Sequence, residues 1–200
     1  TISQGVNEVH ASSYEHMERL VAKYLDKSRP LSVADIGSYD VNGSYRTLYQ
    51  NGGWSYVGLD LSAGPGVDIV LESPYKFPLS RHSFDLVVSG QAFEHIEYFW
   101  QTWLEVIRVL KPGGLAFLLA PSRGPEHRYP QDCWRFYPDS YRALAKFGDC
   151  ELLEVSTDWE PHPDPGSSHW GDTVGVFKKN AQSLRNRIAH SAMRCAFSIH

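Results

Sequence analysis

The chain has 200 residues, of which 42% are hydrophobic and 21% are charged, and its formal net charge at neutral pH is −4. This length and composition fit one globular domain with a single core, and the acidic balance argues against a nucleic-acid-binding protein. No apolar run reaches the ~18 residues of a membrane helix, and the first ten residues lack the apolar core of a signal peptide.

The three cysteines indicate a reducing compartment. They lie far apart and form no C-x-x-C pair: Cys133, Cys150 and Cys195. This spacing predicts neither a zinc knuckle nor a disulfide framework. We therefore expect a cytoplasmic protein with no membrane or nucleic-acid partner.

The first half of the chain alternates between predicted helices and strands. Residues 11–25 have the apolar spacing of an amphipathic helix, which Pro30 ends. Short apolar runs predict buried strands at four places: residues 31–36, 55–60, 67–71 and 84–89. A short helix over residues 44–50 connects the first two strands.

The second half begins with the clearest helical period, over residues 92–110, which Lys111-Pro-Gly-Gly114 ends. The remaining elements follow in order: a fully buried strand over 115–120, a helix over 138–147, strands over 150–157 and 173–177, and a helical tail over 181–200.

Strands that alternate with helices predict an α/β fold with a parallel sheet and helices on both faces. The last two strands have no helix between them, so we expect a long hairpin that makes one edge strand antiparallel. The predicted organisation is an N-terminal helical segment over residues 1–30, one domain over 31–179 and a tail over 180–200.

The first strand ends in a candidate ligand loop. Gly37 at a strand end lets a ligand approach the backbone, but the next residues lack the second glycine of a dinucleotide fingerprint. Asp40 places a negative charge where a phosphate would lie, and Asp35 places a carboxylate just inside the strand end. This pattern fits a ligand with an ammonium group and no phosphate, such as S-adenosylmethionine. Asp60, at the end of the second strand, suits vicinal ribose hydroxyls.

These residues belong to a longer resemblance. From Val33 to Ser122 the chain resembles the class I S-adenosylmethionine-dependent methyltransferases, especially the type 11 group. Four motifs carry it: Asp35-Ile-Gly37, Ser83-Phe-Asp-Leu-Val-Val88, Glu94-His95 and Arg108-Val-Leu-Lys-Pro-Gly-Gly-Leu115. The loop from Gly37 to Gly43 departs from the family by keeping only its two end glycines.

The resemblance implies a Rossmann-like, seven-stranded, mostly parallel sheet with an antiparallel last strand. It also implies S-adenosyl-L-methionine as cofactor and S-adenosyl-L-homocysteine as product. The cofactor contacts expected at the strand ends are Asp35, Gly37, Ser38, Gly43, Asp60, Leu61, Glu72, Ser73, Gly90 and Gln91.

A hydroxyl acceptor needs a group that takes its proton, and the candidates are His95, His127 and Asp132. The segment over residues 122–137 follows the fifth strand and mixes aromatic with polar side chains, as sites for polar rings do. The candidate substrate contacts are Arg128, Tyr129, Trp134, Arg135 and His169. Alternatively, His95 is a structural residue at a helix start, and Asp132 pairs internally with Arg135.

The loop over residues 159–170 contains three groups that bind metals elsewhere, His162, Asp164 and His169. We interpret them as surface residues and predict no metal site.

The sequence therefore predicts a methyltransferase, monomeric or homodimeric, that acts on a small molecule. We expect O-methylation of a sugar, a glycan precursor or a specialised metabolite. The alternatives are an N-methyltransferase for a small amine and a cofactor-binding module without turnover. The missing glycine fingerprint argues against a nucleotide-dependent dehydrogenase.

Overall fold

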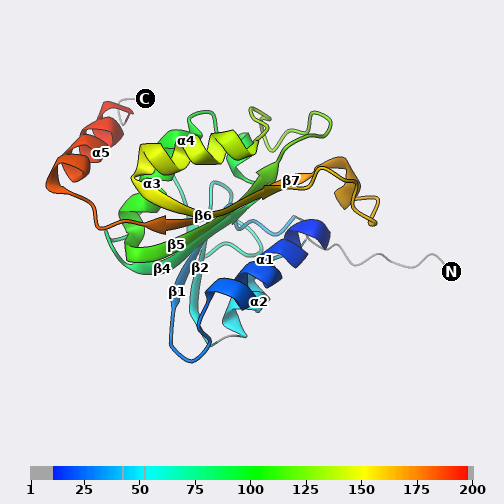
Figure 1. The fold of residues 1–200 in the computed structure, drawn as a ribbon, viewed down its shortest axis with the longest axis horizontal. Helices are drawn as coiled ribbons and strands as arrows, with labels where there is room; N and C mark the ends of the chain where they lie inside the picture. The colour runs from blue at the N-terminus through cyan, green and yellow to red at the C-terminus, as the bar shows by residue number, and fades with distance from the viewer. Residues whose placement is uncertain (1–10, 42, 52, 198–200) are drawn as a thin grey trace.

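A computed structural model describes residues 11–41, 43–51 and 53–197. One sheet lies between two layers of helices (Figure 1). The first ten residues of the predicted N-terminal segment, Asn42 of the ligand loop, Gly52 and the last three residues of the tail lie outside the described residues.

The sheet has seven strands in the order β3-β2-β1-β4-β5-β7-β6. Their bounds are β1 Ser32–Ile36, β2 Ser55–Asp60, β3 Ile69–Val70, β4 Phe84–Gly90, β5 Leu110–Pro121, β6 Cys150–Thr157 and β7 Asp172–Lys179. Strands β1 to β5 pair in parallel, and β7 pairs antiparallel with both of its neighbours. The predicted fold class is confirmed. The strand order reverses between β1 and β4, and such a switch point opens a crevice at the carboxyl ends of the strands.

One expectation about the sheet is wrong. The antiparallel strand β7 does not lie at the edge but is inserted between β5 and β6. Seven of the eight residues of β7 are buried, whereas β6 alternates between exposed and partly buried residues. A strand that is apolar on both faces is favoured inside a sheet, and an alternating strand suits the edge.

Helices cover both faces of the sheet (Figure 1). Their bounds are α1 Ala11–Tyr24, α2 Arg46–Gln50, α3 Phe99–Val109, α4 Pro138–Gly148 and α5 Leu184–Phe197. Successive side chains of β5 point to opposite faces, so Phe117 joins the apolar cluster under α1 and Leu118 the cluster under α3 and α4. The tail helix α5 packs on α3.

The long helix predicted over residues 92–110 is interrupted. A 3₁₀ turn, η1 (Phe93–His95), is followed by extended backbone at Ile96, and α3 begins only at Phe99. The loop after β5 stabilises this break, because Trp134 Nε1 donates hydrogen bonds to the carbonyls of Ile96 and Glu97 at 3.0 and 3.1 Å. The exposed carbonyls at the break thus gain a donor from a distant segment, and η1 stays at the crevice.

The segment Lys111-Pro-Gly-Gly114 also differs from expectation. It does not separate α3 from the fifth strand but belongs to β5, which already pairs at Leu110. The pairing with β4 shifts register between Phe84 and Leu86, so the Pro-Gly-Gly stretch forms an irregularity within the strand.

Candidate functional site

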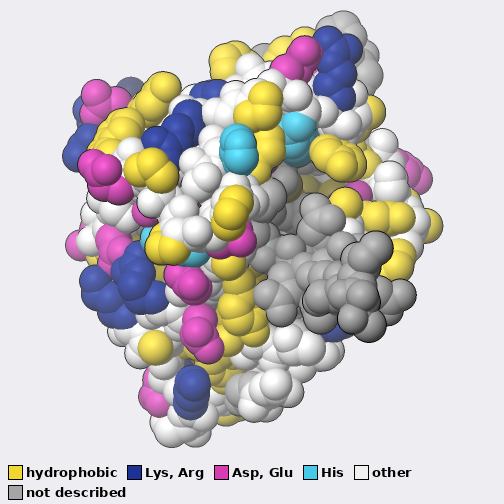
Figure 2. Space-filling model, turned by 90° about the vertical axis from the view of Figure 1, so that its right-hand side faces the viewer, with side chains coloured by type: hydrophobic (Ala, Val, Ile, Leu, Met, Phe, Trp, Pro, Cys, Tyr) yellow, Lys and Arg dark blue, Asp and Glu magenta, His cyan; other side chains and the backbone are white. Residues whose placement is uncertain are grey.

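A cavity of about 1000 Å³ opens at the carboxyl ends of β1, β2 and β4. Its walls come from the ends of these strands, from η1 and from the loops after β5 and before β7. Figure 2 views the molecule from this side, where histidine and hydrophobic side chains stand beside a hollow in the surface. Most of the residues predicted to bind a ligand line this one cavity.

The first wall is formed by the ends of β1 and β2. Gly37 has a φ of 81°, and a Cβ there would lie 2.3 Å from the Cβ of Ala92, so the loop can pass η1 only with glycine at this position. Ser38 is buried beside it, and its Oγ has no hydrogen-bond partner among the described residues. Gly43 also lines the cavity.

Asp60 lies across from Gly37 at the end of β2. One carboxylate oxygen accepts a hydrogen bond from the backbone amide of Tyr39 at 3.1 Å, and the other accepts one from the backbone amide of Ser62 at 3.0 Å. Each oxygen keeps a lone pair, which a ligand hydroxyl in the cavity can use. Leu61, the next residue, is 47% exposed and lines the cavity.

Asp35 is buried at the base of this wall and accepts a hydrogen bond from the Tyr56 hydroxyl. Burial raises the pKa of Asp35 to about 7, although the hydrogen bond from Tyr56 and the charge of Arg46 act in the opposite direction. Its carboxyl group is therefore already paired within the protein.

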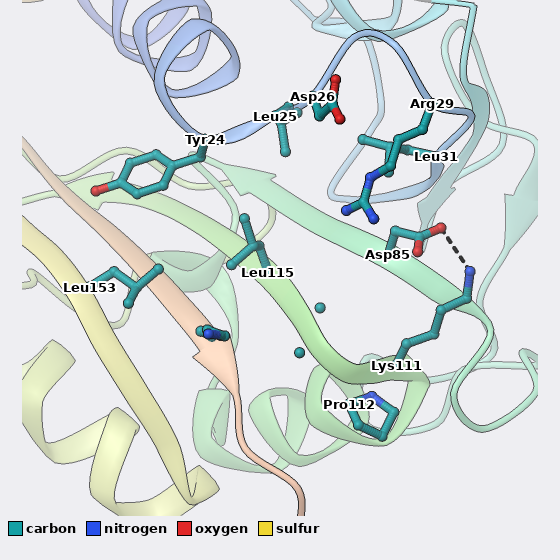
Figure 3. Close-up of a pocket in the computed structure, with 13 residues that line it drawn as sticks. Tyr24, Leu25, Asp26, Arg29, Leu31, Asp85, Lys111, Pro112, Leu115 and Leu153 are labelled. Carbon is teal, nitrogen blue, oxygen red and sulfur yellow. Dashed lines mark hydrogen bonds and ion pairs between the residues drawn. The ribbon is translucent and has the colours of Figure 1, made fainter.

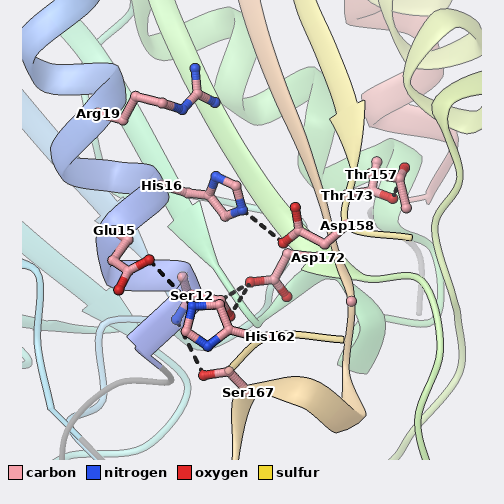
Figure 4. Close-up of polar contacts among 12 residues, drawn as sticks. Ser12, Glu15, His16, Arg19, Thr157, Asp158, His162, Ser167, Asp172 and Thr173 are labelled. Carbon is pink, nitrogen blue, oxygen red and sulfur yellow. Dashed lines mark hydrogen bonds and ion pairs between the residues drawn. The ribbon is translucent and has the colours of Figure 1, made fainter. Parts of the chain in front are cut away.

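Gly90, the last residue of β4, and Gln91, which follows it, line the cavity. The Gln91 amide donates to Ser13 Oγ at 2.9 Å and to Asp172 Oδ1 at 2.7 Å. Asp172 Oδ2 also accepts hydrogen bonds from the hydroxyls of Ser12 and Ser13, on α1, at 3.3 and 2.6 Å (Figure 4). This buried network fixes the start of α1 against β7 at the rim of the cavity.

Two predicted cofactor contacts lie outside this lining. Glu72 and Ser73 follow β3, but the cavity is lined there by their neighbours Leu71, Pro74 and Tyr75.

The opposite wall contains the two histidines predicted from the sequence. The rings of His95 and His127 lie 4.7 Å apart in an edge-on arrangement, and the ring of Trp170 lies 4.4 Å from that of His127. His95 Nδ1 lies 2.5 Å from the carbonyl oxygen of Gln131, which assigns the proton to Nδ1 and the lone pair to Nε2. Burial lowers the pKa of His95, which favours the neutral form of its ring.

Glu94 lies between these histidines and was noted in the sequence only as part of a family motif. Its side chain is fully buried, with Oε1 at 3.6 Å from His95 Nε2 and 4.0 Å from His127 Nε2. Neither carboxylate oxygen accepts a hydrogen bond from another residue in the described part of the chain. Burial raises the pKa of Glu94 to about 8.

The third catalytic candidate, Asp132, is engaged elsewhere. Arg135 donates to both of its oxygens at 2.6 and 2.8 Å, and the backbone amide of His127 donates to one of them at 2.8 Å. The hydrogen bonds from Arg135 hold the pKa of Asp132 well below its usual range despite burial. Asp132 is therefore a poor proton acceptor and instead positions His127.

The other substrate candidates divide between the cavity and its supports. Tyr129 and Arg128 line the cavity, and Arg128 pairs with Glu126 at 2.7 Å. Trp134 and Arg135 do not line it, because their side chains bind the backbone and Asp132. His169 also lies outside the lining and contacts the carbonyl of Pro165 at 2.8 Å.

Several residues that line the cavity were not predicted as site residues, among them the aromatic residues Tyr45, Tyr75 and Trp170. Each is a single aromatic residue without a recognisable motif. Trp170 reaches His127 only because β5 and β7 are neighbours in the sheet, which the sequence does not specify.

A second cavity of about 400 Å³ lies near the amino ends of β1 and β4, at the opposite edge of the sheet (Figure 3). Asp85 and Lys111 form an ion pair of 2.8 Å there. None of the residues predicted to bind a ligand lines this cavity.

The described part of the chain contains no helix long and apolar enough to cross a membrane.

Comparisons with known proteins agree with the geometry. Residues 35–118 match a family model described as a methyltransferase domain. An uncharacterized methyltransferase from Mycobacterium bovis is 32% identical over 87 residues, which cover 38% of this chain and 34% of that protein. The match thus spans about a third of the relative's length. The predicted resemblance to methyltransferases is confirmed.

Two solved structures share the fold at low sequence identity. The Burkholderia thailandensis 1,6-didemethyltoxoflavin-N1-methyltransferase, solved with S-adenosylhomocysteine, has a TM-score of 0.67 at 14% identity and covers 86% of this chain and 79% of its own. The [4+2]-cyclase SpnF has a TM-score of 0.63 at 14% identity, and the match covers 84% of this chain and 82% of its own. At this identity the likeness establishes the fold alone.

Proposed function

We propose that this chain, whose residues 35–118 match a methyltransferase-domain model, binds S-adenosylmethionine and methylates a hydroxyl group of a small polar molecule. The observation that carries the proposal is the cavity itself. One wall offers carboxylate and glycine groups at the strand ends, and the facing wall offers two imidazoles beside aromatic rings.

The first wall fits the cofactor. Asp60 has free lone pairs for the two ribose hydroxyls, and the buried Ser38 Oγ lacks a hydrogen-bond partner within the described residues. Gly37 brings the backbone close to the ligand. The apolar side chains of Leu71, Pro74 and Tyr75 provide a surface for an adenine ring.

When bound, S-adenosylmethionine supplies a methyl group on a positively charged sulfur, which leaves as a neutral thioether. The chain holds the acceptor oxygen in line with that methyl group, and alignment of this kind contributes up to ~7–11 kcal/mol in the best oriented systems. His95, with a free Nε2 lone pair, and its neighbour His127 are placed to accept the hydroxyl proton.

The acceptor wall favours a polar ring, such as a sugar or a hydroxylated metabolite. Tyr129 and Trp170 present aromatic edges and faces beside the histidines, and Arg128 and Gln131 contribute polar groups. Aromatic surfaces with a few converging polar groups bind such rings. The monomeric or dimeric state and the cytoplasmic location stay predictions.

The experiment is calorimetric titration of the chain with S-adenosylmethionine and S-adenosylhomocysteine, followed by an acceptor screen that begins with sugars. Binding should be micromolar in the native chain and weakened at least about tenfold by Asp60→Ala, because a hydrogen-bonded hydroxyl pair is lost. Asp139→Ala, which removes an exposed acid on α4 outside the cavity, is the matched control.

The outcomes separate the alternatives. Methylated oxygen in the product supports the proposal, and methylated nitrogen replaces it with an N-methyltransferase. Cofactor binding without any methyl transfer would favour a cofactor-binding module without turnover. A folded native chain that binds neither cofactor nor product would overturn the proposal.

A further inference from the structure

The side chains of Glu94, His95 and His127 converge at the acceptor wall. One ligand-type atom of each lies within 4.8 Å of the others. Two of these residues are on η1 and the third is on the loop after β5, so the fold brings them together from distant parts of the chain. An ion bound at 2.0–2.2 Å keeps imidazole and carboxylate atoms about 3 Å apart. Glu94 Oε1 lies 3.6 and 4.0 Å from the two Nε2 atoms, which exceeds that separation by about 1 Å or less.

In each imidazole, the ring nitrogen that faces away from Glu94 lies near an oxygen of the loop after β5. His95 Nδ1 contacts the carbonyl of Gln131 at 2.5 Å, which assigns the proton to Nδ1 and the lone pair to Nε2. His127 Nδ1 lies 3.3 Å from the Asp132 carboxylate without forming a hydrogen bond to it, and the Nε2 atoms of both rings lie near Glu94 Oε1. Metal-binding histidines are characteristically held by a carbonyl or a carboxylate in this way.

Asp132 is itself fixed, because Arg135 and the backbone amide of His127 occupy its oxygens. The loop itself therefore holds the Asp132 carboxylate and the backbone of His127 in place beside the ring.

Glu94 provides the second, independent observation. Its side chain is fully buried, and neither oxygen has a hydrogen-bond partner in residues 11–41, 43–51 and 53–197. A buried carboxylate without compensating hydrogen bonds is costly, and buried charges are normally paired or bound to a metal. A cation between Glu94 and the two Nε2 atoms would satisfy it.

We propose that Glu94, His95 and His127 bind a divalent transition-metal ion. Two imidazoles and one carboxylate favour ions of the zinc, iron and manganese type over magnesium or calcium, which prefer oxygen ligands throughout. Three protein ligands leave positions open, and His95 and His127 line the cavity, so these positions face the acceptor.

This site specifies the chemistry of the proposed methyl transfer, on which the inference rests. An acceptor hydroxyl bound to the ion has a lowered pKa and releases its proton to solvent. Its oxygen then forms the bond to the methyl carbon while the carbon–sulfur bond breaks and the electron pair stays on sulfur. In this arrangement the histidines hold the ion and do not themselves take the proton.

The test is cobalt binding to the chelator-treated, folded chain, followed by its visible absorption and by calorimetry, with zinc as competitor. We expect one ion per native chain. Glu94→Gln and His127→Gln should each weaken binding by more than about tenfold. His162→Ala, which removes a partly buried histidine beside Glu15, outside the cavity, should leave cobalt binding unchanged.

Absence of cobalt binding by the native chain, or equal binding by all four proteins, would overturn the metal site. Glu94→Gln keeps the shape of the buried side chain, and His127→Gln changes a residue on a loop. Because the two variants lie on different elements, a folding defect in one of them does not prevent the test. S-adenosylhomocysteine titration of the same samples tests the cofactor wall separately. A chain that binds this product but no cobalt loses the metal site and keeps the proposed function.

Discussion

Asp35 couples the stability of the protein to pH. Its pKa rises from 3.8 in an unfolded chain to about 7, chiefly through burial. The resulting stabilisation relative to the unfolded state is complete below about pH 4 and is lost as the pH rises towards 7. Asp35→Asn removes this dependence and can still accept the Tyr56 hydrogen bond. We expect the free energy of unfolding of Asp35→Asn, relative to that of the native chain, to rise by up to about 4 kcal/mol from pH 4 to pH 7. Urea unfolding measures this difference.

Asp85→Asn is the matched control, since hydrogen bonds from Lys111 and Ser32 outweigh burial and lower the pKa of Asp85. Its contribution is present above about pH 4 and lost below it, so this variant should show the opposite slope. An Asp35→Asn difference that is constant across pH would contradict the assignment.

Gly37 illustrates how one residue sets the shape of the cofactor wall. Its φ of 81° already disfavours other residues, and a Cβ would meet Ala92 at 2.3 Å. Gly37→Ala should therefore cost more than the about 1–2 kcal/mol of a left-handed conformation alone and should weaken S-adenosylhomocysteine binding.

Gly53→Ala measures the cost of the left-handed backbone conformation alone, because Gly53 has a φ of 75° and nothing lies within 4 Å of the added carbon. Chemical unfolding of the two variants gives the comparison. Equal losses of stability would show that the contact with Ala92 is relieved without cost.

At the scale of elements, the end of α3 depends on a lysine from β7. Lys179 is buried, and its Nζ donates to the carbonyls of Ile107 and Leu110 at 2.5 and 2.6 Å. Helix ends leave carbonyls without partners, so this contact joins α3 to β5 and β7.

We expect Lys179→Met to destabilise the protein by roughly 1–3 kcal/mol, because two buried carbonyls lose their donor. Burial lowers the pKa of Lys179 to about 8. The unfolded chain therefore binds more protons between about pH 8 and 10.5, and the native chain should gain stability over this range, whereas the variant should not.

Thermal and urea unfolding at pH 7 and 9.5 provide the measurement. The neighbouring Lys178 is exposed on the same strand, so Lys178→Met should change stability by no more than about 0.5 kcal/mol. Similar losses for both variants would show that the strand, rather than the buried contact, is sensitive to the change.

At the scale of the molecule, the cavity joins two halves of the chain. The cofactor wall comes from β1, β2 and their loops, and the acceptor wall from η1 and the loops after β5 and before β7. Only the order of strands in the sheet makes them face each other.

This division predicts separable effects. Asp60→Ala should raise the Kd of S-adenosylhomocysteine, whereas His127→Gln should leave it within about twofold and lower kcat by roughly 10²–10⁴, as expected for loss of proton transfer or of its metal-assisted equivalent. Calorimetry and steady-state kinetics on both variants check this. A large change of the product Kd in His127→Gln would show that the walls are coupled.

The sequence by itself determined the alternation of strands and helices, the switch to a terminal hairpin and the strand-end residues Gly37 and Asp60. These features follow from local periodicity and from the conformations available to individual residues, which are written in short stretches of chain. The family motifs added the cofactor.

The tertiary structure decided three further features: the place of β7 inside the sheet, the break before α3, and the meeting of Glu94, His95 and His127. Each depends on contacts between distant segments. Trp134 stabilises the break by donating to the carbonyls of Ile96 and Glu97, and Glu94 is buried because the loop after β5 covers η1. Local sequence patterns do not contain such long-range contacts, so the sequence indicated which segments form the acceptor wall but not how their side chains meet.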